Sequence, residues 1–182
     1  MRAWASVLAV VAGLSAAGPA AAQLPERGAW SLQLSPAENP RVGAWRMASE
    51  RTNLGVAVGV GVTRSEQEGG DEGTSWSLTV SPPVKRYAPP VGPFPPYLFG
   101  SVPLGIQREE FGDDAEGSDC TVGAALAGGL DWFPVRGVSV GGHPGFHVVR
   151  NASRSETRFT DLESTSTVLG TFGSGLTLHI YF

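Results

Sequence analysis

Residues 54–63 read LGVAVGVGVT, and their side chains alternate between two kinds. One set consists of Leu54, Val56, Val58, Val60 and Val62, and the other of Gly55, Ala57, Gly59, Gly61 and Thr63. Because successive side chains of a β-strand point to opposite faces, the stretch predicts a strand with one bulky apolar face and one face of small residues.

The same two-residue period recurs along the chain, at 74–80, 97–107, 122–132, 138–148 and 176–182. Two shorter candidate strands, 30–35 and 42–47, precede residue 54, which makes eight strands in all. After residue 22 we find neither the ~20 apolar residues of a transmembrane helix nor the spacing of an amphipathic helix. The sequence therefore predicts an all-β fold, a closed eight-stranded antiparallel up-and-down transmembrane β-barrel.

The first 22 residues have the features of a secretory signal peptide. Arg2 supplies a positive charge, residues 7–18 are mostly apolar or small, and Ala20, Ala21 and Ala22 suit a cleavage site. We predict a signal peptide at 1–22 and one β-barrel domain at 23–182. Cys120 is the single cysteine, so the domain must hold without an internal disulfide.

The composition of the two strand faces bears on whether the barrel lies in water or in a membrane. A lipocalin-like soluble barrel carries charged residues outside and large apolar residues inside. Here charged residues are scarce on both faces, and the second face is built from Gly, Ala, Ser and Thr. Large apolar residues turned to lipid around a narrow interior fit this pattern better. A soluble lipocalin-like binding barrel stays an alternative.

The connections between strands differ in length and charge. Candidate short turns at 48–53 and 133–137 share one side with a longer, proline-rich turn at 88–96. The segments at 65–73, 109–119 and 150–164 hold most of the 17 acidic residues on the other side. Outer-membrane barrels have short periplasmic turns and longer outer loops. Aromatic residues beside the short turns predict an interfacial belt: Tyr87, Tyr97, Trp132, Tyr181 and Phe182. The formal net charge of −4 argues against nucleic acid and against an electrostatic grip on anionic lipid.

Three segments carry a resemblance to a known family: 39–45 (NPRVGAW) followed by 54–56, 129–134 (GLDWFP), and the ending 175–182 (GLTLHIYF). The chain resembles the bacterial outer-membrane eight-stranded barrels grouped with the outer membrane protein A transmembrane domain and the opacity-type proteins. The resemblance implies an outer-membrane location, contact with membrane lipid and lipopolysaccharide, and recognition of terminal Phe182 by the barrel-assembly machinery. Pro103 and Pro144 depart from the pattern, since they fall inside expected strands.

The sequence predicts no cofactor, no metal site and no catalytic residue. Gly59 and Gly61 do not begin a phosphate-binding loop, because Arg64 stands where a third glycine belongs. Acidic residues at 109–119 lack the spacing of an EF-hand and are expected to form a solvated loop.

Three histidines have inward parity: His143, His147 and His179. A membrane-embedded lipid A deacylase of similar size uses a His and Ser pair, but the segment after His147 lacks a close His-x-Ser spacing. We therefore expect interior packing and a protein that is not an enzyme. A lipid-modifying enzyme stays an alternative.

Asp131 is the one acidic residue inside a clearly predicted strand. An unpaired buried carboxylate is costly, and Lys85 and His179 have inward parity at the same end. We predict that Asp131 joins at least one of them, or a water between them, in a polar plug that fixes the barrel register. The alternative is that Asp131 faces water at the turn. The predicted function is a structural, surface or adhesion-type role without a wide pore, since side chains can fill the interior of eight strands.

Overall fold

The computed structural model describes residues 24–36, 40–66, 72–89, 93–111, 115–157, 160–172 and 176–182. The predicted signal peptide lies outside these ranges. Within them the chain forms one antiparallel sheet of 12 strands. None of these residues belongs to a helix with the length and apolar character needed to cross a membrane.

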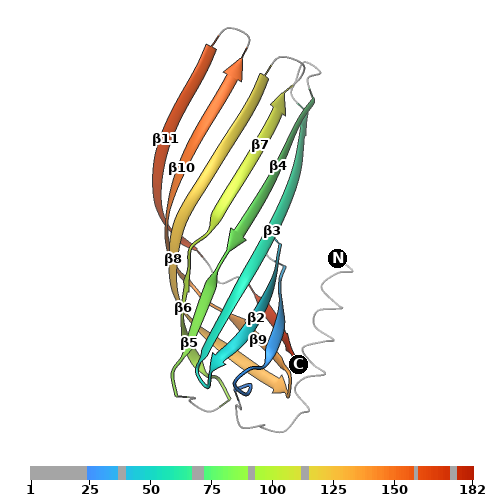
Figure 1. Cartoon of the computed structure of the whole chain (residues 1–182), viewed down its shortest axis with the longest axis vertical. Coiled ribbons are helices and arrows are strands. Elements are labelled where there is room, and N and C mark those ends of the chain that lie inside the picture. The colour runs from blue at the N-terminus through green and yellow to red at the C-terminus, as the bar shows by residue number, and fades with distance from the viewer. Residues whose placement is uncertain are drawn as a thin grey trace, which may run out of the picture.

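The 12 strands are labelled in chain order, and every pair of neighbours in the sheet is antiparallel (Figure 1). They are β1 (Trp30–Ser35), β2 (Arg41–Ser49), β3 (Thr52–Glu66), β4 (Glu72–Ser81), β5 (Pro83–Tyr87), β6 (Pro96–Ser101), β7 (Leu104–Phe111), β8 (Ala115–Val135), β9 (Val138–Gly142), β10 (Gly145–Thr157), β11 (Thr160–Phe172) and β12 (Thr177–Tyr181).

Prolines interrupt the sheet between three pairs of consecutive strands, and two of these breaks, at Pro103 and Pro144, divide a strand that the sequence predicts as one. β4 and β5 are separated at Pro82, β6 and β7 at Val102 and Pro103, and β9 and β10 at His143 and Pro144. Proline has no backbone N–H to give to a ladder. The neighbouring strands run past these breaks, because β3 pairs with both β4 and β5, and β8 pairs with both β6 and β7. Each separated pair therefore acts as one interrupted strand.

The strand pairings form a ring at one end of the molecule, which we call the turn end because the connections β2–β3, β5–β6 and β8–β9 lie there (bottom of Figure 1). Pairing runs from β1 through β2, β3, β5, β6, β8, β9 and β12 and returns to β1. The short first and last segments thus meet, with Leu32 opposite Ile180.

The opposite end, the far end, is built differently (top of Figure 1). There β3, β4, β7, β8, β10 and β11 continue as a curved sheet beyond the shorter β1 and β2. In the described ranges β11 pairs with β10 alone, and the last part of β3, from Val60 on, pairs with β4 alone. The ring of pairings is consequently confined to the turn end.

The two faces of the strands have the predicted composition. Bulky apolar side chains point outward and are exposed, as Val60 and Leu126 are at 62% and 65%. Their neighbours Ala57 and Gly59 point inward and are buried. The outer surface of the ring is therefore apolar, and its interior is lined by small, polar and aromatic residues together with Met47.

Two of the three segments predicted as loops, 109–119 and 150–164, are strand at every described residue, and 112–114 and 158–159 lie outside the described ranges. In the third, 65–73, residues 67–71 lie outside the described ranges, and the four described residues belong to β3 and β4. The strands β5 and β11 are also absent from the sequence prediction. In β11, residues 162–169 are exposed on both faces, so the alternation on which the prediction depends is absent.

The predicted aromatic belt was wrong for three tyrosines, Tyr87, Tyr97 and Tyr181. Tyr181 has the inward parity of His179, its ring stacks on the His179 ring with centres 5.8 Å apart, and its hydroxyl is buried. Tyr87 and Tyr97 are 2% and 3% exposed and pack inside the ring with Met47. Tyr87 shares the inward parity of Lys85, two residues away. The belt was predicted from the position of Tyr87 beside a turn, which does not indicate the face on which its side chain lies. Phe182 is exposed, as expected, and Trp30 adds an outward aromatic ring at the turn end.

Candidate functional site

The interior of the ring at the turn end holds an unusual concentration of buried polar side chains. These are Ser31, Gln33, Asn53, Ser81, Lys85, Asp131, Ser139, Thr177 and His179. They come from β1, β3, β4, β5, β8, β9 and β12, so segments distant in sequence meet in one place. We call this set, with the aromatic residues packed on it, the interior cluster.

Lys85 lies at the centre of the interior cluster. Its Nζ donates to both carboxylate oxygens of Asp131, at 3.3 and 3.2 Å, and lies 3.1 Å from Nε2 of His179. All three side chains are 0% exposed. Of the two predicted partners, Lys85 contacts Asp131, and His179 reaches the carboxylate only through Lys85. The alternative, a carboxylate facing water, is excluded in this structure.

The contacts of His179 define which ring nitrogen carries hydrogen. A lysine ammonium group only donates, so Nε2 of His179 accepts from Lys85. Nδ1 is then the donor, and Oγ of Ser31 lies 3.3 Å from it. His179 thereby links β12 to both β1 and β5 across the interior.

Tyrosines complete the surroundings of the ion pair. The hydroxyl of Tyr87 donates to Oδ2 of Asp131 at 2.6 Å. The Nζ of Lys85 lies 4.4 Å from the centre of the Tyr97 ring, close enough for a cation–π interaction. The sequence prediction missed both residues, although the inward parity of Tyr87 with Lys85 was a usable signal.

A glycine makes room for the carboxylate. Asp131 is opposite Gly141 in the pairing of β8 with β9. A Cβ atom at Gly141 would overlap Oδ1 of Asp131 and would stand 2.8 Å from the backbone oxygen of Leu130. The backbone of β9 thus approaches the ion pair more closely than any residue with a side chain would allow.

A second layer of contacts covers the ion pair from the side of β2. The indole Nε1 of Trp45 donates to Oε1 of Gln33 at 2.5 Å, and its ring meets the His179 ring edge-on at 5.3 Å. Gly55, opposite Trp45 in the β2–β3 ladder, lies under the indole. Polar and aromatic groups therefore fill the interior together.

The other two histidines lie elsewhere. His143 stacks on Phe99 with ring centres 4.2 Å apart, and its Nδ1 is 3.0 Å from the Tyr97 hydroxyl. His147 is beside Phe172. Among the described residues, the histidine that lies within hydrogen-bond distance of a serine is His179, and that serine, Ser31, is 2% exposed.

The remaining candidate features lie in strands or outside the described ranges. Gly59 and Gly61 lie within β3. Of the acidic residues at 109–119, Asp113 and Asp114 lie outside the described ranges. In the part of the chain that the structure describes, no three His, Cys, Asp or Glu side chains lie close enough together to hold a metal ion.

The ring of strands and its packed interior can be compared with known proteins. The sequence matches no protein-family model and no curated protein. Among solved structures it is similar to a major outer membrane protein from Thermus thermophilus, with a TM-score of 0.60. The chain has the fold of an outer-membrane protein. The alignment covers 85% of this chain and 99% of the other at 12% sequence identity, so the likeness concerns the fold alone.

Proposed function

We propose that this protein is an integral outer-membrane β-barrel with a structural, surface or adhesion-type role and no wide pore. It would be a closed eight-stranded barrel of the kind that includes the outer membrane protein A transmembrane domain and the opacity-type proteins. The ring of eight paired segments at the turn end supports this proposal.

The observation that carries the proposal is the apolar outer surface. Large exposed side chains include Leu54, Val60, Leu98, Leu126 and Phe146, and they come from several members of the sheet. Soluble monomers rarely expose so continuous an apolar surface. Contact of these apolar side chains with the hydrocarbon of a membrane is favourable. Pairing of the strands gives hydrogen-bond partners to the backbone N–H and C=O groups, which lipid cannot provide. A soluble lipocalin-like barrel would need the opposite distribution.

The location can be tested on isolated outer membranes. Alkaline carbonate is expected to leave the protein in the membrane pellet, because removing it would expose the apolar outer face to water. A peripheral protein of known behaviour should be released in parallel. Recovery of this protein in the soluble fraction would refute the membrane location.

The interior cluster supports the second half of the proposal. Trp45, Tyr87, Lys85, His179 and Asp131 are fully or almost fully buried across the width of the ring. Eight strands enclose only enough space for side chains. The barrel would therefore act as a closed scaffold at the turn end.

Planar bilayer recording tests this closure. We expect little or no steady conductance, since ions would have to displace the Lys85–Asp131 pair. A Lys85→Ala, Asp131→Ala double variant removes the central contact and serves as the comparison. Large, stable single-channel steps from the unaltered protein would contradict a closed interior.

The proposal further assigns no enzymatic role and gives Phe182 a part in assembly. Phe182 is 81% exposed, and its backbone exchanges hydrogen bonds with Trp30, at 2.9 and 3.1 Å. The phenyl side chain of Phe182 is thus exposed, while the backbone of the same residue pairs with β1 and helps to close the ring of strands. An exposed terminal aromatic side chain suits recognition by the barrel-assembly machinery.

A further inference from the structure

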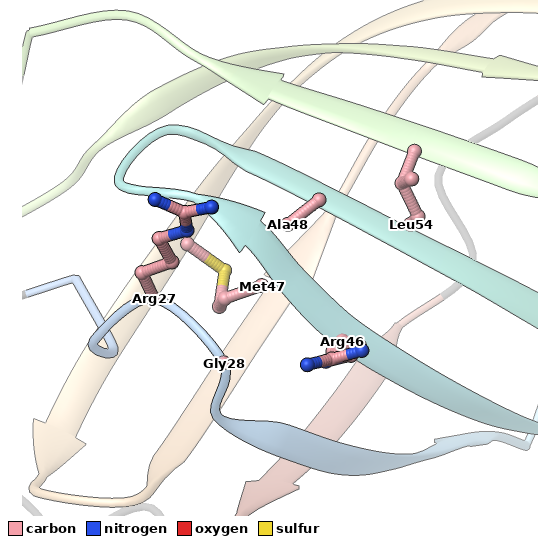
Figure 2. Close-up of a pocket in the computed structure, with 6 residues that line it drawn as sticks. All are labelled: Arg27, Gly28, Arg46, Met47, Ala48 and Leu54. Atoms are coloured by element: carbon pink, nitrogen blue, oxygen red, sulfur yellow. The ribbon is translucent and has the colours of Figure 1, made fainter.

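A hollow of about 510 Å³ lies at the turn end, between residues 27–28, which precede β1, and the β2–β3 hairpin. Figure 2 shows the residues that line it: Arg27, Gly28, Arg46, Met47, Ala48 and Leu54. It has two arginines from different segments and several apolar groups. Such a lining suits a molecule with a negative group and an apolar part.

Backbone contacts hold Arg27 beside this hollow. The N–H of Gly28 donates to the carbonyl of Met47 at 2.8 Å, and the N–H of Met47 donates to the carbonyl of Ala29 at 2.9 Å. Gly28 has a φ of 91°, a conformation that residues with a side chain rarely adopt. The turn that carries Arg27 is therefore fixed against the end of β2.

Arg46 is held by its neighbours in the sheet. It is opposite Trp30 on β1 and Leu54 on β3, and its guanidinium lies 5.6 Å from the centre of the Trp30 ring. Trp30 and Leu54 are both 48% exposed on the outer face. Tryptophan favours the headgroup level of a membrane, which places Arg46 at the same level.

The charge around the hollow is the reverse of the charge of the whole chain. Exposed arginines at the turn end are Arg27, Arg46, Arg51, Arg86 and Arg136, and the exposed carboxylates described there are those of Glu26, Glu50 and the terminal Phe182. Neither Arg27 nor Arg46 forms an ion pair with a described residue. A net negative chain thus has a locally positive rim.

We propose that this hollow binds an anionic phospholipid of the adjacent membrane leaflet. The lipid phosphate would lie between Arg27 and Arg46, and the start of its acyl chains would run along Leu54 and the apolar outer face. A guanidinium group provides the paired N–H donors that suit phosphate oxygens. This inference rests on the proposed membrane location and adds a lipid class and its binding residues.

Native mass spectrometry of the folded protein in detergent tests the site. With phosphatidylglycerol and phosphatidylcholine of identical acyl chains, we expect preferential retention of phosphatidylglycerol. Arg27→Gln and Arg46→Gln should each weaken that retention by about fivefold, the usual contribution of one basic residue near anionic lipid. Arg136→Gln, an exposed arginine at the same end but outside the hollow, is the matched control and should leave retention unchanged.

Several results would overturn the proposal. These are equal retention of both lipids, unchanged retention in an Arg27→Gln, Arg46→Gln double variant, or an equal loss in Arg136→Gln. Binding of glycerol 3-phosphate as tight as that of phosphatidylglycerol would indicate a phosphate site without a lipid role. If carbonate extraction keeps the protein in the membrane, such results refute the lipid site alone. Release by carbonate would refute the membrane location and this inference with it.

Discussion

Asp131→Ala is expected to lower the free energy of unfolding by about 3–5 kcal/mol, the usual cost of removing one partner of a buried ion pair. The substitution leaves Lys85 without its carboxylate in a fully buried position and removes the acceptor of the Tyr87 hydroxyl. Urea unfolding in detergent micelles or lipid, followed by tryptophan fluorescence, measures the change.

Asp119→Ala is the matched control for Asp131→Ala. Asp119 also has inward parity on β8, but it lies toward the far end and is partly exposed. Its replacement should alter stability by no more than about 0.5 kcal/mol. A normal unfolding curve for Asp131→Ala would show that the buried pair does not hold the ring together.

A double substitution separates the loss of a pair from the isolation of a charge. Lys85→Met with Asp131→Leu replaces both groups by apolar side chains of similar size. Such replacements of buried ion pairs are often neutral or stabilising. We therefore expect the double variant to unfold at higher urea than Asp131→Ala alone. An equal or greater loss would assign the stability to the hydrogen bonds of Tyr87 and His179.

The sequence identifies Lys85 as one of two candidate partners of Asp131, the other being His179, because two simple facts combine. The parity of a residue indicates which strand face it occupies, and its distance from a turn indicates its height in the barrel. Lys85, His179 and Asp131 share the inward face at the same end, but which of the two contacts Asp131 depends on the arrangement of the strands, and the structure shows that it is Lys85. Parity also places Tyr87 inside, where its hydroxyl binds the same carboxylate. The position of Tyr87 beside a turn favours an outward side chain at the membrane interface, and for this residue that prediction is wrong.

The far end was harder to predict for a physical reason. Alternation is imposed on a strand when one face is buried and the other is not. In β11, residues 162–169 are exposed on both faces, and Thr165, Ser166 and Thr167 give no period. Among the described strands β11 pairs with β10 alone, and neither face of residues 162–169 is buried. Because no buried face imposes a two-residue period, the local sequence of β11 does not indicate a strand.

Trp45→Ala is expected to cost about 3–5 kcal/mol, as is usual for removing a large buried aromatic side chain. Trp45 is 1% exposed, and its loss would leave a void beside His179 and an unpaired Oε1 on Gln33. Urea unfolding again provides the measurement. Trp30→Ala removes an outward indole that is about half exposed and should cost clearly less.

The close contact between Trp45 and Gly55 allows a sharper test of the same packing. A Cβ at Gly55 would overlap Cδ2 of the indole, so Gly55→Ala should destabilise the unaltered protein by about 1–3 kcal/mol through overpacking. In a Trp45→Ala background that clash is absent, and Gly55→Ala should become nearly neutral. Gly128→Ala, at an outward glycine with no atom within 4 Å of its Cβ position, should be tolerated in both backgrounds. The difference between the two Gly55→Ala effects measures the coupling between the residues. Equal effects in both backgrounds would show that the indole does not occupy the space above Gly55.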